Sequence, residues 1–152
     1  MNTYERLKEL GIVLPETAKP LANYVPSVRV GNLVFISGNL PLVAGKLIYE
    51  GRIPSAVSID DGYKAARQAG INIIAAIHGE IGDLNHVLRI IRLNGFVASD
   101  DDFTGQPKVI NGASDLMVEV FGDKGKHTRA VMGVNRLPIN TPVEIDAIIE
   151  VE

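Results

Sequence analysis

Polar and apolar residues alternate most regularly near the carboxyl end of the chain, over residues 143–151. Apolar residues from Val143 onward fall on one side of this segment, and Glu144 with other acidic residues falls on the opposite side. Strand side chains point alternately to the two faces of a sheet, so the pattern predicts a half-buried strand. The preceding residues 126–138 are mostly apolar and predict a second strand, which Arg129 enters near its start.

The short, proline-bounded connection between these segments predicts that they pair as a hairpin about Ile139 and Asn140. In that register Arg129 lies opposite Glu150. Glu144 then lies about six residues away from Arg129 along the ladder, roughly 20 Å at ~3.3 Å per residue. A buried arginine needs an anion nearby, because an unpaired buried charge is costly. The hairpin keeps Glu144 from being that partner within one chain, so a site that uses both side chains would form between subunits.

Periodicity predicts the remaining elements. Residues 58–81 and 107–121 carry apolar side chains at three- and four-residue spacing, so each is expected to be a helix with one face on a sheet. Residues 21–41 predict a hairpin that turns at Gly31 and Asn32. Three further elements are expected, namely a capped helix at residues 3–10, a short edge strand at 47–49 and a long strand at 87–97.

These elements predict an α+β fold, in which residues 1–152 form a single domain with one mixed β-sheet and two long helices on one face. Helices on one face leave the other face uncovered. The apolar residues expected on that face are Val30, Phe35, Val131 and Ile148. We therefore expect the uncovered face to be buried in an oligomer.

Charge and composition exclude several kinds of site. The net charge is −3, basic residues are scattered and only 5% of residues are aromatic, which argues against nucleic-acid binding. Cysteine is absent and the three histidines lack ligand spacing, so no metal site is predicted. The amino end is polar and no apolar run approaches the ~20 residues of a membrane span. A cytoplasmic protein without membrane contact is expected.

Few residues remain that could carry chemistry. Arg129 could hold a carboxylate through two parallel hydrogen bonds, and Glu144 could position or activate a water. The alternative is that both belong to internal ion pairs. Tyr24 and the small polar cluster at residues 37–39 could contribute as well. That cluster ends an apolar strand, either as simple chain punctuation or as a place where the backbone approaches a ligand.

The roles of other charged and titratable residues are open in the sequence. His127 shares a strand face with Arg129 and could neighbour a site, although a surface imidazole is the commoner case. Alternation places Arg92 on one face of its strand and Arg89 on the other. Each arginine could add positive charge to a site or line the axis of an oligomer. The acidic loop at residues 99–102 lacks the spacing of a calcium loop, and it is expected to cap the next helix in solvent.

Two segments of the chain resemble the YjgF/RidA family of reactive-intermediate deaminases. They are Tyr24 followed by Val-Gly-Asn-Leu-Val-Phe-Ile-Ser-Gly-Asn-Leu-Pro at residues 30–41, and Arg129 followed by Val-Asn-Arg-Leu-Pro at 134–138 and Val-Glu-Ile at 143–145. The resemblance covers about residues 20–152. Residues 1–19 would then be an N-terminal helical extension that marks a longer subfamily.

That resemblance implies a chorismate-mutase-like fold and a homotrimer whose sheets line a central barrel, with ligand sites in the clefts between subunits. In deaminating members the matching arginine binds the carboxylate of a 2-imino or 2-enamino acid such as 2-aminoacrylate. The matching glutamate and a water hydrolyse it to a 2-keto acid and ammonia. Here Arg129 would clamp the carboxylate and Glu144 would order the water. No cofactor is implied, because the substrate carbon is already electrophilic. The residues that would bind or enclose the substrate beside Arg129 are Tyr24, Ser37, Gly38 and Asn39.

The chain departs from the family pattern near these residues. Asn39 stands where the family often has glutamine, His127 and Thr128 stand where it often has Pro-Ala or Pro-Thr, and Val131 stands where it often has cysteine. Two other functions are weighed beside deamination. One is a non-catalytic trimer that binds small carboxylates such as keto acids and regulates a partner. The other is ribonuclease activity, a label that this family carries, against which the acidic pI and the few aromatic residues argue.

Overall fold

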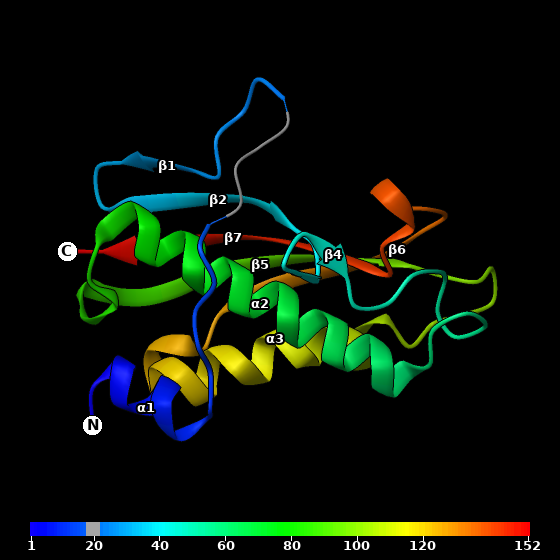
Figure 1. The fold of residues 1–152 in the computed structure, drawn as a ribbon, viewed down its shortest axis with the longest axis horizontal. Helices are drawn as coiled ribbons and strands as arrows, with labels where there is room; N and C mark the ends of the chain where they lie inside the picture. The colour runs from blue at the N-terminus through cyan, green and yellow to red at the C-terminus, as the bar shows by residue number, and fades with distance from the viewer. Residues whose placement is uncertain (18–21) are drawn as a thin grey trace.

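Residues 1–17 and 22–152 are described by the structure, which is a computed structural model. Its elements are α1 (Thr3–Glu9), β1 (Ser27–Val30), β2 (Leu33–Asn39), β3 (Leu42–Val43), β4 (Lys46–Leu47), α2 (Ile59–Ile81), η1 (Leu84–His86), β5 (Val87–Ala98), α3 (Gln106–Phe121), η2 (Gly122–Gly125), β6 (Thr128–Val134), η3 (Pro138–Asn140) and β7 (Val143–Val151). Five strands form one mixed sheet in the order β1-β2-β7-β5-β6. Figure 1 shows α2 and α3 together on one side of that sheet, as the hydrophobic pattern predicted.

The hairpin predicted near the amino end is confirmed by the antiparallel pair β1 and β2. Gly31 has a φ of 58° at the turn, a left-handed conformation that a residue without a Cβ atom adopts at little cost. β2 also pairs with β7, so it lies inside the sheet, and Val34 and Ile36 are buried beneath the helices. Leu21, where the hairpin was expected to begin, lies outside the described residues.

The two long helices form one closely packed layer. α2 begins after Ser58, whose hydroxyl oxygen accepts a hydrogen bond from the amide of Asp61 at 3.1 Å, and its C-cap is Gly82. α3 approaches α2 so closely at Gly112 that a Cβ atom there would overlap the carbonyl oxygen of Tyr63. The buried side chains of α2 are small or β-branched, so the helix lies flat against the sheet. This close contact with α2 fixes the position of α3, and therefore the positions of the polar side chains that α3 carries.

The two carboxyl-terminal strands do not pair with each other, so the predicted hairpin about Ile139 and Asn140 is wrong. β6 runs parallel to β5 at the edge of the sheet, while β7 lies between β2 and β5 and is antiparallel to both. Burial explains this order, because β5 and β7 carry the most fully buried side chains and each gains a neighbour on both sides. As a result Arg129 pairs with Leu93 of β5 and does not lie opposite Glu150.

β5 carries two irregularities that overturn the predicted orientation of its arginines. Its register with β7 shifts just before Arg89 and again just before Arg92. Each shift has the effect of a β-bulge, in which one extra residue changes the face that the following side chains occupy. Arg89 lies opposite Glu150 and Arg92 lies opposite Ile148, so both arginines point to the face that the helices leave uncovered.

The uncovered face of the sheet carries apolar side chains, in part as predicted. Val30 is 62% exposed and Phe35 is 41% exposed, and Ile148 lies opposite Phe35. Val131 was also expected there, but the parallel register aligns it with Gly95, on the face that α3 covers, and it packs against the core. Uncovered apolar surface of this kind is typical of a face that meets another protein.

The short elements at the margins follow the predictions less evenly. The strand expected at residues 47–49 is displaced, because β4 ends at Leu47 and pairs with β3 in a separate two-stranded sheet. The capping of α1 is confirmed, since the Asn2 side chain accepts from the Glu5 amide and the Glu5 carboxylate accepts from the Asn2 amide, each at 2.9 Å. Tyr4 of α1 joins this helix to α2 through a hydrogen bond with His78.

Candidate functional site

Arg129 lies on the edge strand β6 with its side chain on the face that α3 covers. Its Nη1 donates to Asn111 Oδ1 at 2.8 Å and to Ser114 Oγ at 3.1 Å, and both acceptors belong to α3. Within the described residues these are its only side-chain hydrogen bonds, and no ion pair among them includes it. A guanidinium has five donors, and Nε and Nη2 have no hydrogen-bond partner among the described residues, so the edge that these two atoms form is suited to a planar acceptor such as a carboxylate.

His127 is half-buried beside Arg129, so the surface interpretation of this imidazole is wrong. Its Nδ1 lies 2.6 Å from the carbonyl oxygen of Gly125, and its Nε2 lies 2.9 Å from Ser114 Oγ. A carbonyl oxygen only accepts, so Nδ1 carries a proton, and in the neutral ring Nε2 accepts from the Ser114 hydroxyl. Burial lowers the pKa of His127 below its usual value, and the positive charge of Arg129 lowers it further. The neutral ring is therefore the favoured form near pH 7.

Glu144 lies on β7 with its side chain on the uncovered face of the sheet, next to β2. A Cβ atom on Gly38 would lie 3.0 Å from Glu144 Cδ, so the carboxylate rests directly on the backbone of that glycine. Burial raises the pKa of Glu144, and the nearby negative charge of Asp146 raises it further. A carboxyl group whose pKa moves toward neutrality is better suited to give and take protons. Gly38 and Glu144, predicted separately, are thus neighbours.

Arg129 and Glu144 are not brought together within one chain, because they lie on opposite faces of the sheet. Across β5 the register places Arg129 level with Ala147, whose side chain is buried under the helices. Glu144 lies further along β7 and points the other way, opposite Phe96. The spacing of about six residues along a hairpin that the sequence predicted is therefore absent, and strand order and the facing of the side chains keep Arg129 and Glu144 apart within one chain.

The other sequence-predicted residues divide between the two faces. Tyr24 is 56% exposed on the segment before β1. Ser37 holds that segment, because its hydroxyl donates to the carbonyl oxygen of Val25 at 2.6 Å. Asn39 donates from Nδ2 to the Ser37 carbonyl oxygen at 2.8 Å, and it borders a cavity beside Asn72 on the α2 side. Of these residues, Gly38 contacts Glu144, Ser37 joins β2 to the segment that carries Tyr24, and Asn39 supports the Ser37 backbone.

Asn111 and Ser114, which bind Arg129, were missed by reasoning from the sequence. They stand three residues apart on α3, so they lie on the same side of the helix. That side adjoins the buried stripe of Val109, Ala113 and Leu116. Two uncharged polar residues on the flank of a buried helix were the available signal. Only the pairing of β6 with β5 brings Arg129 opposite that flank.

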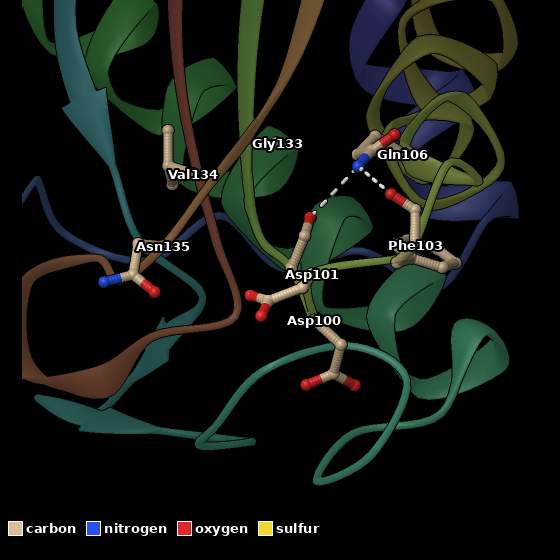
Figure 2. A pocket seen from close by; sticks show the side chains of 8 residues that line it. Asp100, Asp101, Phe103, Gln106, Gly133, Val134 and Asn135 are labelled. Carbon is tan, nitrogen blue, oxygen red and sulfur yellow. Dashed lines mark hydrogen bonds between the residues drawn. The ribbon is translucent and has the colours of Figure 1, made fainter.

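A separate pocket of about 240 Å³ lies where β5 and β6 end and α3 begins. Figure 2 shows Gln106 and Phe103 on one side of it and Val134 and Asn135 on the other, with the Asp100 and Asp101 carboxylates between them. Asp100 does not cap α3, whose N-cap is Gly105 without a side-chain bond, so the predicted capping role of this loop is wrong.

Asp100 instead joins its loop to the loop before α2. Its carboxylate accepts from the Ser55 amide and hydroxyl, each at 2.8 Å, and lies 3.6 Å from Arg52. The hydrogen bonds from Ser55 lower the pKa of Asp100, and the charge of Arg52 lowers it further. The carboxylates beside this pocket are thus engaged in holding two loops together.

Neither a metal-binding cluster nor a membrane-crossing helix is present in the part of the chain that the structure describes. No group of three or more histidine, aspartate or glutamate side chains has the arrangement of a metal site in residues 1–17 and 22–152. Among the described helices, none is long and apolar enough to cross a membrane.

Comparison with known proteins gives one consistent family. The model of the family described as "YjgF/chorismate mutase-like, putative endoribonuclease" matches residues 4–150. Protein TCP17 of Trypanosoma cruzi is 39% identical over 145 residues, which cover 95% of this chain and 91% of that protein. A 2-iminobutanoate/2-iminopropanoate deaminase of Dermatophagoides farinae is 28% identical over 141 residues, covering 93% and 95%. The crystal structure of Atu1372 from Agrobacterium tumefaciens, a protein of unknown function, is 44% identical with a TM-score of 0.93, covering 99% of this chain and 92% of that one.

Proposed function

The chain belongs to the YjgF/chorismate mutase-like family, and we propose that it hydrolyses reactive 2-enamino and 2-imino acids, such as 2-aminoacrylate, to 2-keto acids and ammonia. The observation that carries the proposal is the Nε and Nη2 edge of Arg129, which has no hydrogen-bond partner among the described residues. A relative in the mite Dermatophagoides farinae is named as a deaminase of this substrate class. The names of TCP17 and Atu1372 state no activity, so the proposal rests on the site of this chain.

Arg129 is proposed to clamp the substrate carboxylate. Asn111 and Ser114 occupy Nη1 and are both uncharged, so the guanidinium keeps its full charge for a ligand. A bidentate carboxylate fits the remaining edge and supplies the anion that a half-buried arginine requires. Hydrogen bonds to charged groups contribute about 1.5–3 kcal/mol each, so such a clamp can supply most of the affinity for a three- or four-carbon acid.

Glu144 of the partner subunit is proposed to order and activate the hydrolytic water. A 2-enamino acid first becomes the 2-imino acid as a proton moves from its nitrogen to C3. The water oxygen then bonds to the imine carbon at C2 while one water proton passes to the imine nitrogen, which gives an adduct with a hydroxyl and an amino group on C2. The hydroxyl proton next passes to the nitrogen as the C2–N bond breaks, so ammonia leaves and the 2-keto acid remains. Glu144 takes the proton from water and returns it to nitrogen, a role that its raised pKa supports. Tyr24, Ser37 and Gly38 are proposed to enclose the substrate, with Asn39 fixing the Ser37 carbonyl.

The homotrimer belongs to the same proposal. Arg129 and Glu144 lie on opposite faces of the sheet in one chain, so a site that uses both requires a second copy. The uncovered face carries the exposed Val30 and Phe35, and burial of such a face against other copies would remove apolar surface from water. A cyclic assembly repeats the same contact and produces one equivalent cleft for each subunit.

The test is release of pyruvate and ammonia from 2-aminoacrylate generated in situ by a β-eliminating enzyme, above the rate of spontaneous hydrolysis. Arg129→Ala removes the clamp and is expected to lower kcat/KM by roughly a hundredfold, which corresponds to about 3 kcal/mol. The matched control is Arg136→Ala, because Arg136 is exposed and its Nη1 donates only to Asn140 within the described residues. Wild-type activity in Arg129→Ala would contradict the proposal.

A second outcome separates deamination from ligand binding alone. Both functions require Arg129 to bind a carboxylate, but only deamination requires Glu144. Tight binding of pyruvate without turnover of any 2-imino acid would identify a non-catalytic carboxylate-binding protein. Cleavage of single-stranded RNA by the purified protein, lost in Arg129→Ala, would identify a ribonuclease.

A further inference from the structure

Arg129 is held by a continuous chain of hydrogen bonds that runs from the backbone of η2 to β6. The Gly125 carbonyl accepts from His127 Nδ1, His127 Nε2 accepts from the Ser114 hydroxyl, and Ser114 Oγ accepts from Arg129 Nη1. The first bond fixes the tautomer, and in the neutral ring the tautomer fixes the direction of the second bond, while the third always runs from Arg129 because a guanidinium only donates. The Ser114 hydrogen is thus committed to the imidazole, which leaves its oxygen lone pairs for the guanidinium.

We propose that Ser114 and His127 are positioning residues for Arg129, and that the charge of His127 is coupled to occupation of Arg129 by a carboxylate. This inference rests on the proposed function in one respect, namely that Arg129 binds a carboxylate. It includes a departure from the sequence pattern of deaminating relatives, since His127 stands where that pattern often has proline.

The positioning role follows from the number of acceptors that Arg129 Nη1 has. Asn111 accepts one of its two hydrogens and Ser114 accepts the other, so rotation of the guanidinium would break two hydrogen bonds. A carboxylate that arrives at the Nε and Nη2 edge therefore meets donors that are already aligned. Removing the Ser114 hydroxyl would leave Arg129 Nη1 with one acceptor and allow the guanidinium to rotate. Ser114→Ala should weaken carboxylate binding, whereas Ser114→Thr keeps the hydroxyl.

The coupling follows from the charges around His127. Arg129 of β6 lies beside His127, and Lys126 precedes His127 in the sequence. His127 also lines a cavity of about 390 Å³, and the other charged residues that line it are Lys126, Arg89 of β5 and Glu150 of β7. The α3 side chain that contacts its ring is the uncharged Ser114. Protonation of His127 thus adds a positive charge beside an arginine. A carboxylate on Arg129 would offset that repulsion.

Linkage then fixes the direction of the effect. A bound carboxylate raises the pKa of His127, and by reciprocity protonated His127 raises the affinity of Arg129 for the carboxylate. Binding should therefore tighten as pH falls through the range in which His127 titrates, and it should be weakest where the ring is neutral. A fixed structural histidine without this coupling would produce no such dependence.

The experiment is an NMR titration of the three imidazole rings in the full-length protein, with and without saturating pyruvate. Pyruvate is expected to move the titration midpoint of His127 to higher pH. His78, which bonds to Tyr4, and the more exposed His86 are internal references that should not move. An unchanged His127 midpoint in the presence of bound pyruvate would overturn the coupling.

Two variants complete the test. His127→Gln offers a side-chain oxygen that can accept from Ser114 but does not titrate, so pyruvate affinity should depend less on pH than in the wild type between about pH 5 and 8, the range in which histidine titrates. A pH dependence equal to that of the wild type would overturn the coupling. Ser114→Ala is expected to raise the Kd for pyruvate by about fivefold or more, with recovery in Ser114→Thr. Equal affinities in all three proteins would overturn the positioning role.

A further arm distinguishes failure of this inference from failure of the proposed function. If pyruvate binds to the wild type at no pH, the carboxylate clamp itself is refuted. In that case the coupling between His127 and Arg129 can still be tested without a ligand. Arg129→Gln removes the positive charge beside His127 and should raise the titration midpoint of His127. An unchanged midpoint in that variant would refute the link between the two residues.

Discussion

The contact between α2 and α3 at Gly112 gives a prediction whose magnitude follows from the structure. A Cβ atom at this position would overlap the Tyr63 carbonyl oxygen and would lie 2.9 Å from its carbonyl carbon and 3.0 Å from the Arg67 amide nitrogen. Ordinary van der Waals contact begins at 3.4 Å. These are backbone atoms of a helix and cannot rotate away, so in Gly112→Ala one helix must move by roughly an ångström.

The expected change in stability combines two opposing effects. Overpacking a core costs about 1–3 kcal/mol, and overlap with backbone atoms favours the upper end of that range. Alanine has a better helix propensity than glycine by about 1 kcal/mol, which offsets part of the cost. The free energy of unfolding should therefore fall by about 2 kcal/mol, and Tm should fall by roughly 4–8 °C for a domain of this size.

Urea denaturation and calorimetry of Gly112→Ala measure this effect, with Gly79→Ala in α2 as the matched control. A Cβ atom at Gly79 would meet Thr17 Oγ1 at 2.9 Å, and that side chain can turn aside with the loss of one hydrogen bond to the Ala75 carbonyl oxygen, a cost that the better helix propensity of alanine offsets. The control should stay within about 1 kcal/mol of the wild type. A Gly112→Ala protein as stable as the wild type would refute the reasoning.

Three further predictions concern charge and capping. The raised pKa of Glu144 means that ionisation of this carboxyl group opposes folding. Glu144→Gln should therefore unfold at a higher temperature than the wild type near pH 7, and the difference should disappear below about pH 4. The same variant should lose deamination. The lowered pKa of Asp100 has the opposite sign, so Asp100→Asn should be less stable than the wild type at neutral pH, with a difference that shrinks as pH falls below about 4. Both comparisons need thermal unfolding at several pH values, and the reverse order would contradict them. Asn2→Ala removes one side of the capping box and should cost about 1 kcal/mol, detected as faster amide exchange confined to α1.

Features set by neighbouring residues in the sequence could be predicted. Ser58 marked the start of α2, Gly31 marked the turn between β1 and β2, and the spacing of apolar residues gave both long helices and the face they cover. Each depends on side chains within a few residues of one another, where capping, left-handed backbone and amphipathic burial act directly.

Strand order could not be predicted in the same way. The segment after Arg129 and the segment from Val143 onward are adjacent in sequence, but β7 contributes more to the core between β2 and β5 than it would at an edge beside β6. The shifts before Arg89 and Arg92 leave no signature in the hydrophobic pattern, because a bulge is a property of the pairing of two strands. Both errors came from non-local pairing.

Reasoning from the sequence selected the charged residues of the candidate site but missed the uncharged residues that support them. Arg129 and Glu144 could be selected because charged residues in apolar strands are exceptional. Asn111, Ser114 and the inward turn of His127 depend on how α3 lies across β6, which the close contact with α2 determines. Side chains that orient an arginine are ordinary polar residues until the tertiary structure brings them together.

The central claim is that the site combines Arg129 of one subunit with Glu144 of the partner subunit, and subunit mixing tests it most directly. Arg129→Ala and Glu144→Gln chains are each expected to be inactive alone. Co-expressed in equal amounts and purified through two different tags, they should recover deamination, because one of the three clefts in every mixed trimer would contain both intact residues. Mixed assemblies no more active than either parent would contradict the account.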